Sequence, residues 1–517
     1  MAKHFSARPL PLPLRGLVQL RPAADIWYKP ALSAVVAMAV PDAVLLAAGR
    51  LDLALYTAAG ALCALYGHDL PYARRARTLA DVVLGTLAGV GAALTCSALT
   101  GSAPVLVLGA ALVAAAHRAA CDASGIGPPG NVVLTFVTSS AFFVPQRPGD
   151  VPGHLALVAA AGALAWLVCM APAVRRPHGP ERVTVSRALT AAARLLEATT
   201  PAERAAARHA AVTAVAAARR AVAGRPPLTQ PLASAEAALA AGAADPAAAA
   251  RLRAAARAVR RDRTALSPAA VRAARPALRG TAPLPVAVRV ALGAALAGWT
   301  SLALGSAHPY WAVVGAASVV QPNTTLSWQR AVQRVLGNLL GLALFTALLP
   351  VARTGAAALV GLSLALQFGA EAFMSRNYWL GSVCVTPMAL LLGEFAAPHP
   401  AGGLVADRWT DTLVGCAVGL LTCAAVTNRR ATRRAEAALV RARAARHAAA
   451  ARLHAAGDRE QARDRLAAAL AELRTAADVA AGEWWQPAPA AARAAREEHD
   501  EGHRVLATLP VQAPAPG

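Results

Sequence analysis

Residues 308–350 read HPYWAVVGAASVVQPNTTLSWQRAVQRVLGNLLGLALFTALLP, and this stretch decides the fold class. Two apolar runs, at about 309–321 and 335–350, are separated by a short polar connection that carries Arg330 and Arg334. A helix needs about 17 to 25 predominantly apolar residues to cross a bilayer, and the second run lies near the lower limit. The stretch therefore indicates membrane helices joined by a short basic connection.

The same pattern recurs in two blocks of apolar windows. The first block contains windows at about 31–48, 51–67, 79–99, 103–117, 130–145 and 153–174. The second contains windows at about 286–304, 309–321, 335–350, 354–370, 378–395 and 410–427. The chain as a whole is 56% hydrophobic and 15% charged, with a mean hydropathy of +0.44. This composition excludes a disordered chain and is too apolar for an ordinary soluble enzyme of 517 residues.

The basic residues predict the orientation of these windows. If the N-terminus is cytoplasmic and every window crosses once, the basic residues left in external segments are Arg50, Arg147, Arg353 and Arg408. Cytoplasmic connections of membrane proteins carry an excess of Lys and Arg, so the sequence predicts twelve crossings with both termini inside. The net charge of +23 comes almost entirely from arginine, in an alanine-rich chain typical of a GC-rich genome. We therefore expect basic helix faces near anionic lipid rather than binding to nucleic acid.

The fold class predicted is an all-α membrane protein with two repeats of about six transmembrane helices, each followed by a cytoplasmic helical region. Ala- and Arg-rich helices are expected at about 182–198, 202–223 and 232–263, and again from 428 to about 480 and at 488–507. The predicted regions are a cytoplasmic N-tail at 1–30, a first membrane block at 31–174, a helical insert at 175–285, a second membrane block at 286–427 and a helical C-terminal region at 428–517.

The two membrane blocks resemble each other in sequence. Residues 56–60 align with residues 311–315, and a basic connection follows each segment. Further along, Gly85 and Gly89 align with Gly337 and Gly341, a small-xxx-small spacing that favours close helix packing. Six crossings in each block give the copies the same orientation, which predicts a parallel repeat about an axis near the membrane normal.

Several short motifs of the second block point to a known family. They are His308-Pro309-Tyr310-Trp311, Trp328-Gln329-Arg330 followed by Arg334, Asn377-Tyr378-Trp379, Val385-Thr386-Pro387 and Asp407-Arg408. On these motifs the second block resembles the fusaric acid resistance family of integral membrane transporters, which includes bacterial aromatic acid exporters. The first block departs from the pattern, because no Pro-Tyr-Trp precedes residue 56.

The resemblance implies export of small, often aromatic, organic anions across the bacterial plasma membrane, driven by the proton gradient. The candidate substrate path residues are Tyr310, Trp311, Gln321, Arg330, Arg334, Thr386 and Arg408. Arg330 and Arg334 share one helix face, which is consistent with a mouth that attracts carboxylates or with simple positive-inside anchoring. Tyr310 and Trp311 could form a stacking surface or an interfacial belt.

Carboxylates at membrane depth are costly and are candidates for proton coupling. The candidates are Asp42, Glu371 and Glu394, each inside or at the end of an apolar window. A passive organic-anion channel would need no such group, and it remains the main alternative. A membrane scaffold or sensor that does not transport is a third alternative.

The sequence contains no signature of an enzyme or a cofactor. Walker P-loop, HExxH and Gly-x-Ser-x-Gly motifs are missing, so neither ATP hydrolysis nor another catalytic activity is predicted. The seven cysteines form no CxxC pair and the twelve histidines are scattered, so no metal site is predicted. The partners considered are membrane lipid, a small organic-anion substrate and, as an open alternative, further copies of the chain in a homo-oligomer.

Overall fold

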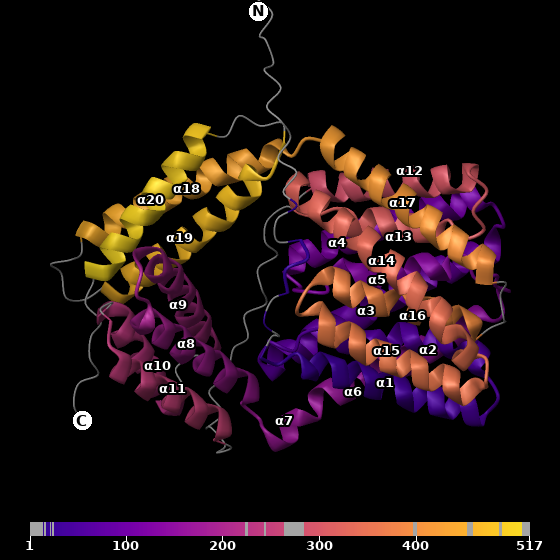
Figure 1. The fold of residues 1–517 in the computed structure, drawn as a ribbon, viewed down its shortest axis with the longest axis horizontal. Coiled ribbons are helices and arrows are strands. Elements are labelled where there is room, and N and C mark those ends of the chain that lie inside the picture. The colour runs from indigo at the N-terminus through magenta and orange to yellow at the C-terminus, as the bar shows by residue number, and fades with distance from the viewer. Residues whose placement is uncertain are drawn as a thin grey trace, which may run out of the picture.

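The computed structural model describes residues 14, 17–20, 22, 25–222, 226–241, 244–262, 284–395, 401–451, 459–484 and 489–508. Every regular element in these residues is helical and none is a strand, which confirms the predicted all-α class. Figure 1 shows a bundle of membrane helices on the right and a group of soluble helices beyond one end of it. The protein is a multi-pass membrane protein.

The first membrane block contains six main helices. They are α1 (Tyr28–Ala47), α2 (Ala54–Ala61, extended by 3-10 turns at Leu51–Leu53 and Leu62–Leu65), α3 (Tyr72–Leu99), α4 (Ala103–Ser124), α5 (Asn131–Ala141) and α6 (Val151–Met170). The second block also contains six helices. Its helices are α12 (Leu284–Ala303), α13 (Tyr310–Val319), α14 (Thr324–Ala352), α15 (Ala356–Met374), α16 (Tyr378–Glu394) and α17 (Ala401–Ala425).

Helix lengths correct the prediction of twelve full crossings. In the described residues, seven helices are long and apolar enough to span a bilayer, or eight if α17 is counted with the bent helix that follows it. Four other apolar segments are shorter: Leu51–Leu65, Asn131–Ala141, Tyr310–Val319 and Tyr378–Gly393. The 10 residues of α13 rise only about 15 Å, half of a hydrocarbon core of about 30 Å. Hydropathy overestimated these segments because the windows also counted apolar residues, such as Val320, that are not helical.

Short helices are tolerated here because protein surrounds them. Every residue of α13 from Trp311 to Val319 is buried. The chain leaves this helix in an extended conformation at Val320, whose carbonyl accepts a hydrogen bond from Arg118 Nη1 of α4 at 3.1 Å. Non-helical backbone can lie at membrane depth only where protein or a water-filled cavity satisfies its polar groups.

The two blocks share one pattern of helix pairing. In the first block α2 packs on α6 and α3 packs on α5, while in the second α13 packs on α17 and α14 packs on α16. The first helix of each block packs on the fourth helix of the other, so that α1 contacts α15 and α12 contacts α4. Two aligned glycines also occupy equivalent contacts. A Cβ on Gly60 would lie 2.5 Å from the Gly162 nitrogen of α6, and a Cβ on Gly315 would lie 3.2 Å from the Gly415 Cα of α17. The two blocks therefore share their pattern of helix contacts.

Two of the long helices begin well before their apolar windows. The helix α14 starts at Thr324, and the Asn323 side chain caps it by accepting from the Leu326 N–H at 2.8 Å. Arg330 and Arg334 therefore lie within α14 rather than in a connecting loop. The equivalent helix α3 likewise starts at Tyr72 and includes the arginines at 74, 75 and 77. Arginine is a good helix former, so the helix continues where the hydropathy falls.

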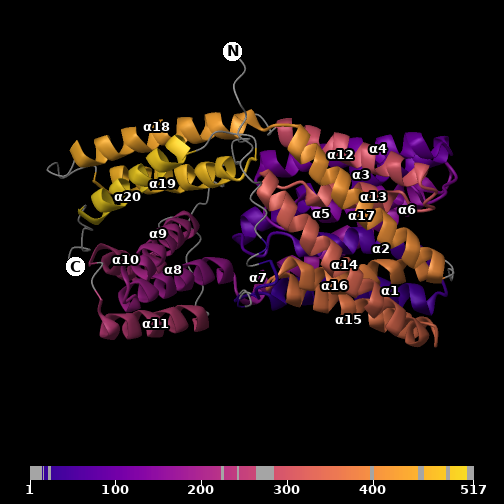
Figure 2. The same cartoon turned by 45° about the horizontal axis from the view of Figure 1, so that its top comes forward.

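The soluble helices form two packed groups. After the short α7 (Pro172–Arg175), the insert contains α8 (Gly179–Glu197), α9 (Pro201–Val222), α10 (Pro226–Ala241) and α11 (Pro246–Arg261). The C-terminal region contains α18 (Arg429–Ala451), α19 (Arg459–Ala481) and α20 (Pro489–Thr508). The single helix expected at 232–263 is thus divided in two. The groups touch each other, since α9 packs on α19 and α10 on α20, as Figure 2 also shows.

Candidate functional site

A cavity of about 2590 Å³ lies within the membrane bundle and opens beside the soluble insert. At the open end it is lined by Arg220 of α9 and by Arg74 and Arg77 of α3. Its deep end is lined by Asn338 of α14 and Arg408 of α17. The cavity thus leads from a basic mouth to polar side chains in the middle of the bundle.

Arg408 is the most unusual side chain of the deep end. It is only 3% exposed, and its Nε and Nη1 atoms have no hydrogen-bond partner. Its guanidinium carbon lies 3.6 Å from the centre of the Trp311 ring. Phe136 of the first block stacks on the Trp311 ring, with ring centres 5.7 Å apart. A buried cation without a carboxylate partner is costly, and an anion in the cavity would offset that cost.

Arg334 is a second guanidinium of the same cavity. Its side chain is buried, its Nη1 donates to the Tyr378 hydroxyl at 3.0 Å, and its Nε has no partner. On the other side of Tyr378, the Arg330 guanidinium lies 3.8 Å from the ring centre. Tyr378 therefore holds both arginines of α14 at the cavity wall, through a hydrogen bond and a cation–π contact.

A hydrogen-bonded chain of neutral side chains crosses the deep end. Asn338 Nδ2 donates to Thr412 Oγ1 at 2.7 Å, and the Thr386 hydroxyl donates to Asn338 Oδ1 at 2.5 Å. These contacts join α14, α16 and α17 between Arg334 and Arg408 in the bundle. They fix the amide of Asn338, a cavity-lining group that the sequence analysis did not select.

Polar contacts join the helices at the far end, beyond Trp311. His308 Nδ1 lies 2.9 Å from Asp407 Oδ2, and the two oxygens of Asp411 accept from Ser301 at 2.5 Å and from Ser306 at 2.9 Å. Asp407 and Asp411, the carboxylates nearest to Arg408 in sequence, therefore have His308, Ser301 and Ser306 as their hydrogen-bond partners. These contacts tie α12 and the start of α13 to α17 on the side opposite the cavity mouth.

The predicted path residues are distributed unevenly around the cavity. Gln321, Arg330, Arg334 and Arg408 line it directly. Trp311 and Thr386 do not line the cavity but contact residues that do. Trp311 packs under the Arg408 guanidinium, and Thr386 donates a hydrogen bond to Asn338. Tyr310 does not line it and packs against Phe143 with ring centres 5.7 Å apart. Arg408, which the prediction counted among the external basic residues, lies within α17, and its buried side chain contacts the Trp311 ring.

The three predicted coupling carboxylates have different positions. Glu371, on α15, lines the cavity. Asp42 is buried within α1, with its Oδ2 unpartnered, but it is not part of the cavity wall. Glu394 ends α16, and its side chain lies outside the described residues. Of the described candidates, only Glu371 has access to the same space as the arginines.

The glycines selected for packing are also not equivalent. A Cβ on Gly89, Gly337 or Gly341 would lie within 2.8 Å of an atom of a neighbouring helix. Gly85 is different, because a Cβ there would meet nothing within 4 Å. The predicted packing role of Gly85 is therefore wrong, because its Cβ position faces open space, although its carbonyl lies 3.3 Å from His117 Nε2 of α4.

A further wall element was missed by the sequence analysis. Residues 17–20 of the N-tail lie at the mouth, where the Leu17 carbonyl accepts hydrogen bonds from Gln333 Nε2 at 3.1 Å and Asn377 Nδ2 at 2.8 Å. Leu17 and Gln19 line the cavity. Only the long-range contacts reveal this position, because the tail carries no periodic pattern.

The comparisons with known proteins concern the second membrane block. Residues 294–422 match the family model described as fusaric acid resistance protein-like. No curated protein and no solved structure gives a significant match. The matched segment contains both arginines of α14 that line the cavity, the Trp311–Arg408 pair and Asn338. The second membrane block is therefore similar to the fusaric acid resistance protein-like family, the resemblance that its motifs predicted.

Proposed function

We propose that the protein is a secondary transporter that exports small organic acids, especially aromatic ones, across the bacterial plasma membrane with proton coupling. The observation that carries this proposal is the pair of buried guanidiniums, Arg334 and Arg408, that reach one cavity with unpartnered nitrogens. A carboxylate accepts hydrogen bonds from such groups, and bonds to charged groups are worth about 1.5–3 kcal/mol.

The aromatic preference is supported by the wall around Arg408. Trp311 and Phe136 stack on each other beneath the guanidinium, and Val385 and Met388 add apolar surface to the cavity lining. An aromatic acid matches this arrangement, since its ring can lie against the apolar wall while its carboxylate meets Arg408.

The direction of transport is supported by the position of the mouth. The cavity opens on the side of the soluble helices, where Arg74, Arg77 and Arg330 lie. An excess of arginine is typical of the cytoplasmic side, so the mouth would take up its substrate from the cytoplasm. Both termini would then be cytoplasmic as well.

Proton coupling is supported by Glu371, whose carboxyl faces the same cavity. In an exchange mechanism, a proton would enter from outside as the organic anion leaves, and one titratable group reached from both sides suffices for this step. A passive channel would need no carboxylate in the path, and its flux would follow the substrate gradient alone.

The test is uptake of radiolabelled benzoate into inverted membrane vesicles with and without a pH gradient. We expect wild-type protein to concentrate benzoate, Glu371→Gln to lose this accumulation, and Asp42→Asn to keep it, because Asp42 lies away from the cavity. Wild-type flux that never exceeds equilibrium would contradict a coupled transporter and favour the channel. Accumulation by Glu371→Gln at the wild-type level would contradict the role of Glu371.

A further inference from the structure

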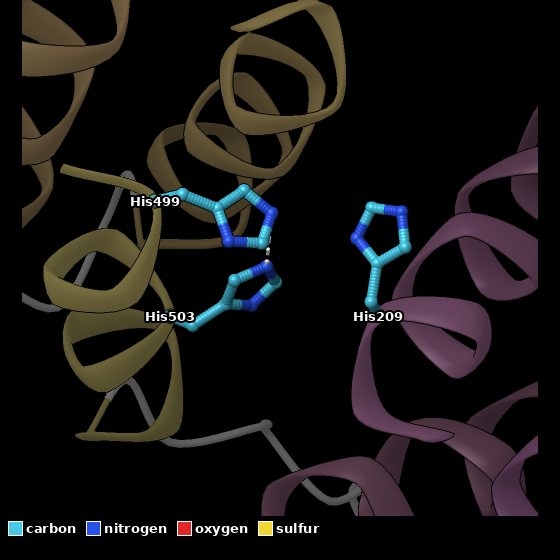
Figure 3. A group of neighbouring side chains, drawn as sticks. All are labelled: His209, His499 and His503. Atoms are coloured by element: carbon cyan, nitrogen blue, oxygen red, sulfur yellow. Dashed lines mark hydrogen bonds between the residues drawn. The ribbon is translucent and has the colours of Figure 1, made fainter. Parts of the chain in front are cut away.

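Three histidines meet where the two soluble helical groups touch. His209 lies on α9 of the insert, and His499 and His503 lie on α20 of the C-terminal region. Figure 3 shows the His209 ring across the interface from the other two, which project from one helix face. One nitrogen atom from each ring lies within 4.8 Å of the corresponding nitrogen atoms of the other two rings.

The spacing of the two histidines on α20 suits chelation. Residues four apart lie on the same face of a helix, one turn from each other. The Nε2 atoms of His499 and His503 are 3.3 Å apart. Two nitrogens bound to one tetrahedral zinc ion at 2.0–2.1 Å are separated by about 3.3–3.4 Å, so this pair already has the spacing of adjacent ligands.

The three rings lie in a partly buried environment that also contains arginine side chains. Burial lowers the pKa of His209 and His499, and it lowers that of His503 to about 4, with further contributions from the neighbouring histidines and from Arg208 and Arg474. In the hydrogen bond between the two Nε2 atoms, one ring donates its N–H and the other accepts with its lone pair. Both rings must therefore carry their proton on Nδ1 before the two Nε2 atoms can bind one ion.

The surroundings offer some of the support that metal ligands require. The Asp500 carboxylate lies 3.8 Å from His499 Nδ1, on the side of the ring away from His503. Carboxylates commonly orient a ligating imidazole through its second nitrogen. His503 Nδ1 is buried and unpartnered, and a cavity of about 30 Å³ that His503 lines with Arg208 and Leu506 is large enough for one water molecule.

We propose that His209, His499 and His503 bind a zinc-class divalent transition-metal ion, with water as the fourth ligand, and that this ion fastens the insert to the C-terminal region. Three imidazoles favour zinc, nickel or copper over magnesium or calcium, which prefer oxygen ligands. The ion would hold α9 against α20, two elements that belong to different halves of the chain. This inference stands apart from the proposed transport of organic acids.

The test uses the full-length protein in detergent, purified with a tag that contains no histidine and stripped of metal by chelation. Zn²⁺ is titrated in competition with a chromophoric chelator, and Co²⁺ is added separately to record its visible absorption. We expect one ion per chain and a Co²⁺ spectrum of a four-coordinate site. His209→Gln, His499→Gln and His503→Gln should each weaken Zn²⁺ binding at least tenfold, since even outer-shell substitutions cost about 10- to 100-fold.

The matched control is His447→Gln, an exposed histidine on α18 that lies outside the cluster. It should bind Zn²⁺ like wild type, and circular dichroism should show unchanged helix content in all four variants. Wild-type protein that binds no Zn²⁺ above background would overturn the proposal. Equal binding by His209→Gln and wild type would overturn it too, because the ion would then not join the two regions.

Discussion

The two membrane blocks have the same helix order and the same pairings, yet they differ in what they place in the cavity. Trp311 stands four residues before Gly315 and carries the Arg408 guanidinium on its ring. Tyr56 stands four residues before Gly60, and it stacks on His154 with ring centres 4.0 Å apart. The His154 ring is in turn held by Gln146, at 2.7 Å.

The difference shows how two blocks with the same helix pairings can have different roles. In the first block, Gln146 forms hydrogen bonds with both members of the aromatic pair. Its Nε2 donates to the Tyr56 hydroxyl, and its Oε1 accepts from His154 Nδ1. In the second block the aromatic ring supports a cation whose Nε and Nη1 remain unpartnered. We infer that the first block supplies scaffold, apolar wall such as Phe136 and basic residues at the mouth, while the second block supplies the buried charges at the deep end of the cavity.

The largest expected effect concerns how each block holds its soluble region. In the second block, Arg289 of α12 and Glu483 form a bidentate pair at 3.0 and 2.8 Å, and both side chains are almost completely buried. Breaking a buried pair costs about 3–5 kcal/mol, so Glu483→Gln should strongly lower the thermal unfolding temperature.

The N-tail that leads into the first block offers the matched control for this pair. Asp25 pairs with Arg187 and Arg260, but all three side chains are about one-third exposed. Pairs of this kind contribute about 0–1 kcal/mol, so Asp25→Asn should change the unfolding temperature little. Equal destabilisation by the two substitutions would contradict the difference drawn between the two attachments.

The next effect concerns the two aromatic pairs in the blocks. Arg408→Met should weaken benzoate binding about 10- to 100-fold, because it removes a charged hydrogen bond worth about 1.5–3 kcal/mol. His154→Met, in the first block, should leave the affinity within about twofold, because His154 does not line the cavity. Isothermal titration of both variants measures this directly, and similar losses in the two would mean that the blocks share the ligand.

A smaller effect separates two aligned glycines. A Cβ on Gly337 would lie 2.5 Å from Ser382 Cβ, whereas one on Gly85 would meet nothing within 4 Å. Gly337→Ala should therefore destabilise the protein by about 1–3 kcal/mol through overpacking. Gly85→Ala should be neutral or should stabilise it by up to about 1 kcal/mol, since alanine is the better helix former. Thermal unfolding of both variants would sharpen the comparison, and a reversed order would contradict it.

The smallest effect concerns the mouth. Arg330 lies on the Tyr378 ring and contributes positive potential to the cavity lining. Arg330→Gln should slow benzoate association by a few fold at low salt, and the difference should shrink as added salt shortens the Debye length to about 8 Å at physiological ionic strength. Stopped-flow kinetics at two salt concentrations checks this. A loss that does not depend on salt would mean that Arg330 acts through packing.

Much of the fold could be predicted from the sequence because hydropathy marks buried and lipid-facing segments directly. The windows located all twelve apolar helices of the two blocks. They could not give the lengths of α13 and α14, because a hydropathy average registers neither an extended apolar residue such as Val320 nor a helix that continues through Arg330 and Arg334.

The site could be predicted only in part. Motifs identified Trp311 and both arginines of α14, since these residues lie close together in sequence. The inward turn of Arg408, the contact of Phe136 with Trp311 and the three-histidine cluster depend on helices far apart in the chain. No periodicity or spacing in one sequence contains such contacts, because they arise from the pairing of the two blocks and of the two soluble groups.

The central claim is that the cavity recognises an organic anion through buried charge supplied by the second block. The most direct test compares the affinity of the wild-type protein for benzoate and for benzamide, which has a similar shape but no charge. We predict that benzoate binds at least tenfold more tightly, and that the difference disappears when Arg334→Gln and Arg408→Met are combined. Equal affinity of the wild-type protein for the two compounds would contradict the account.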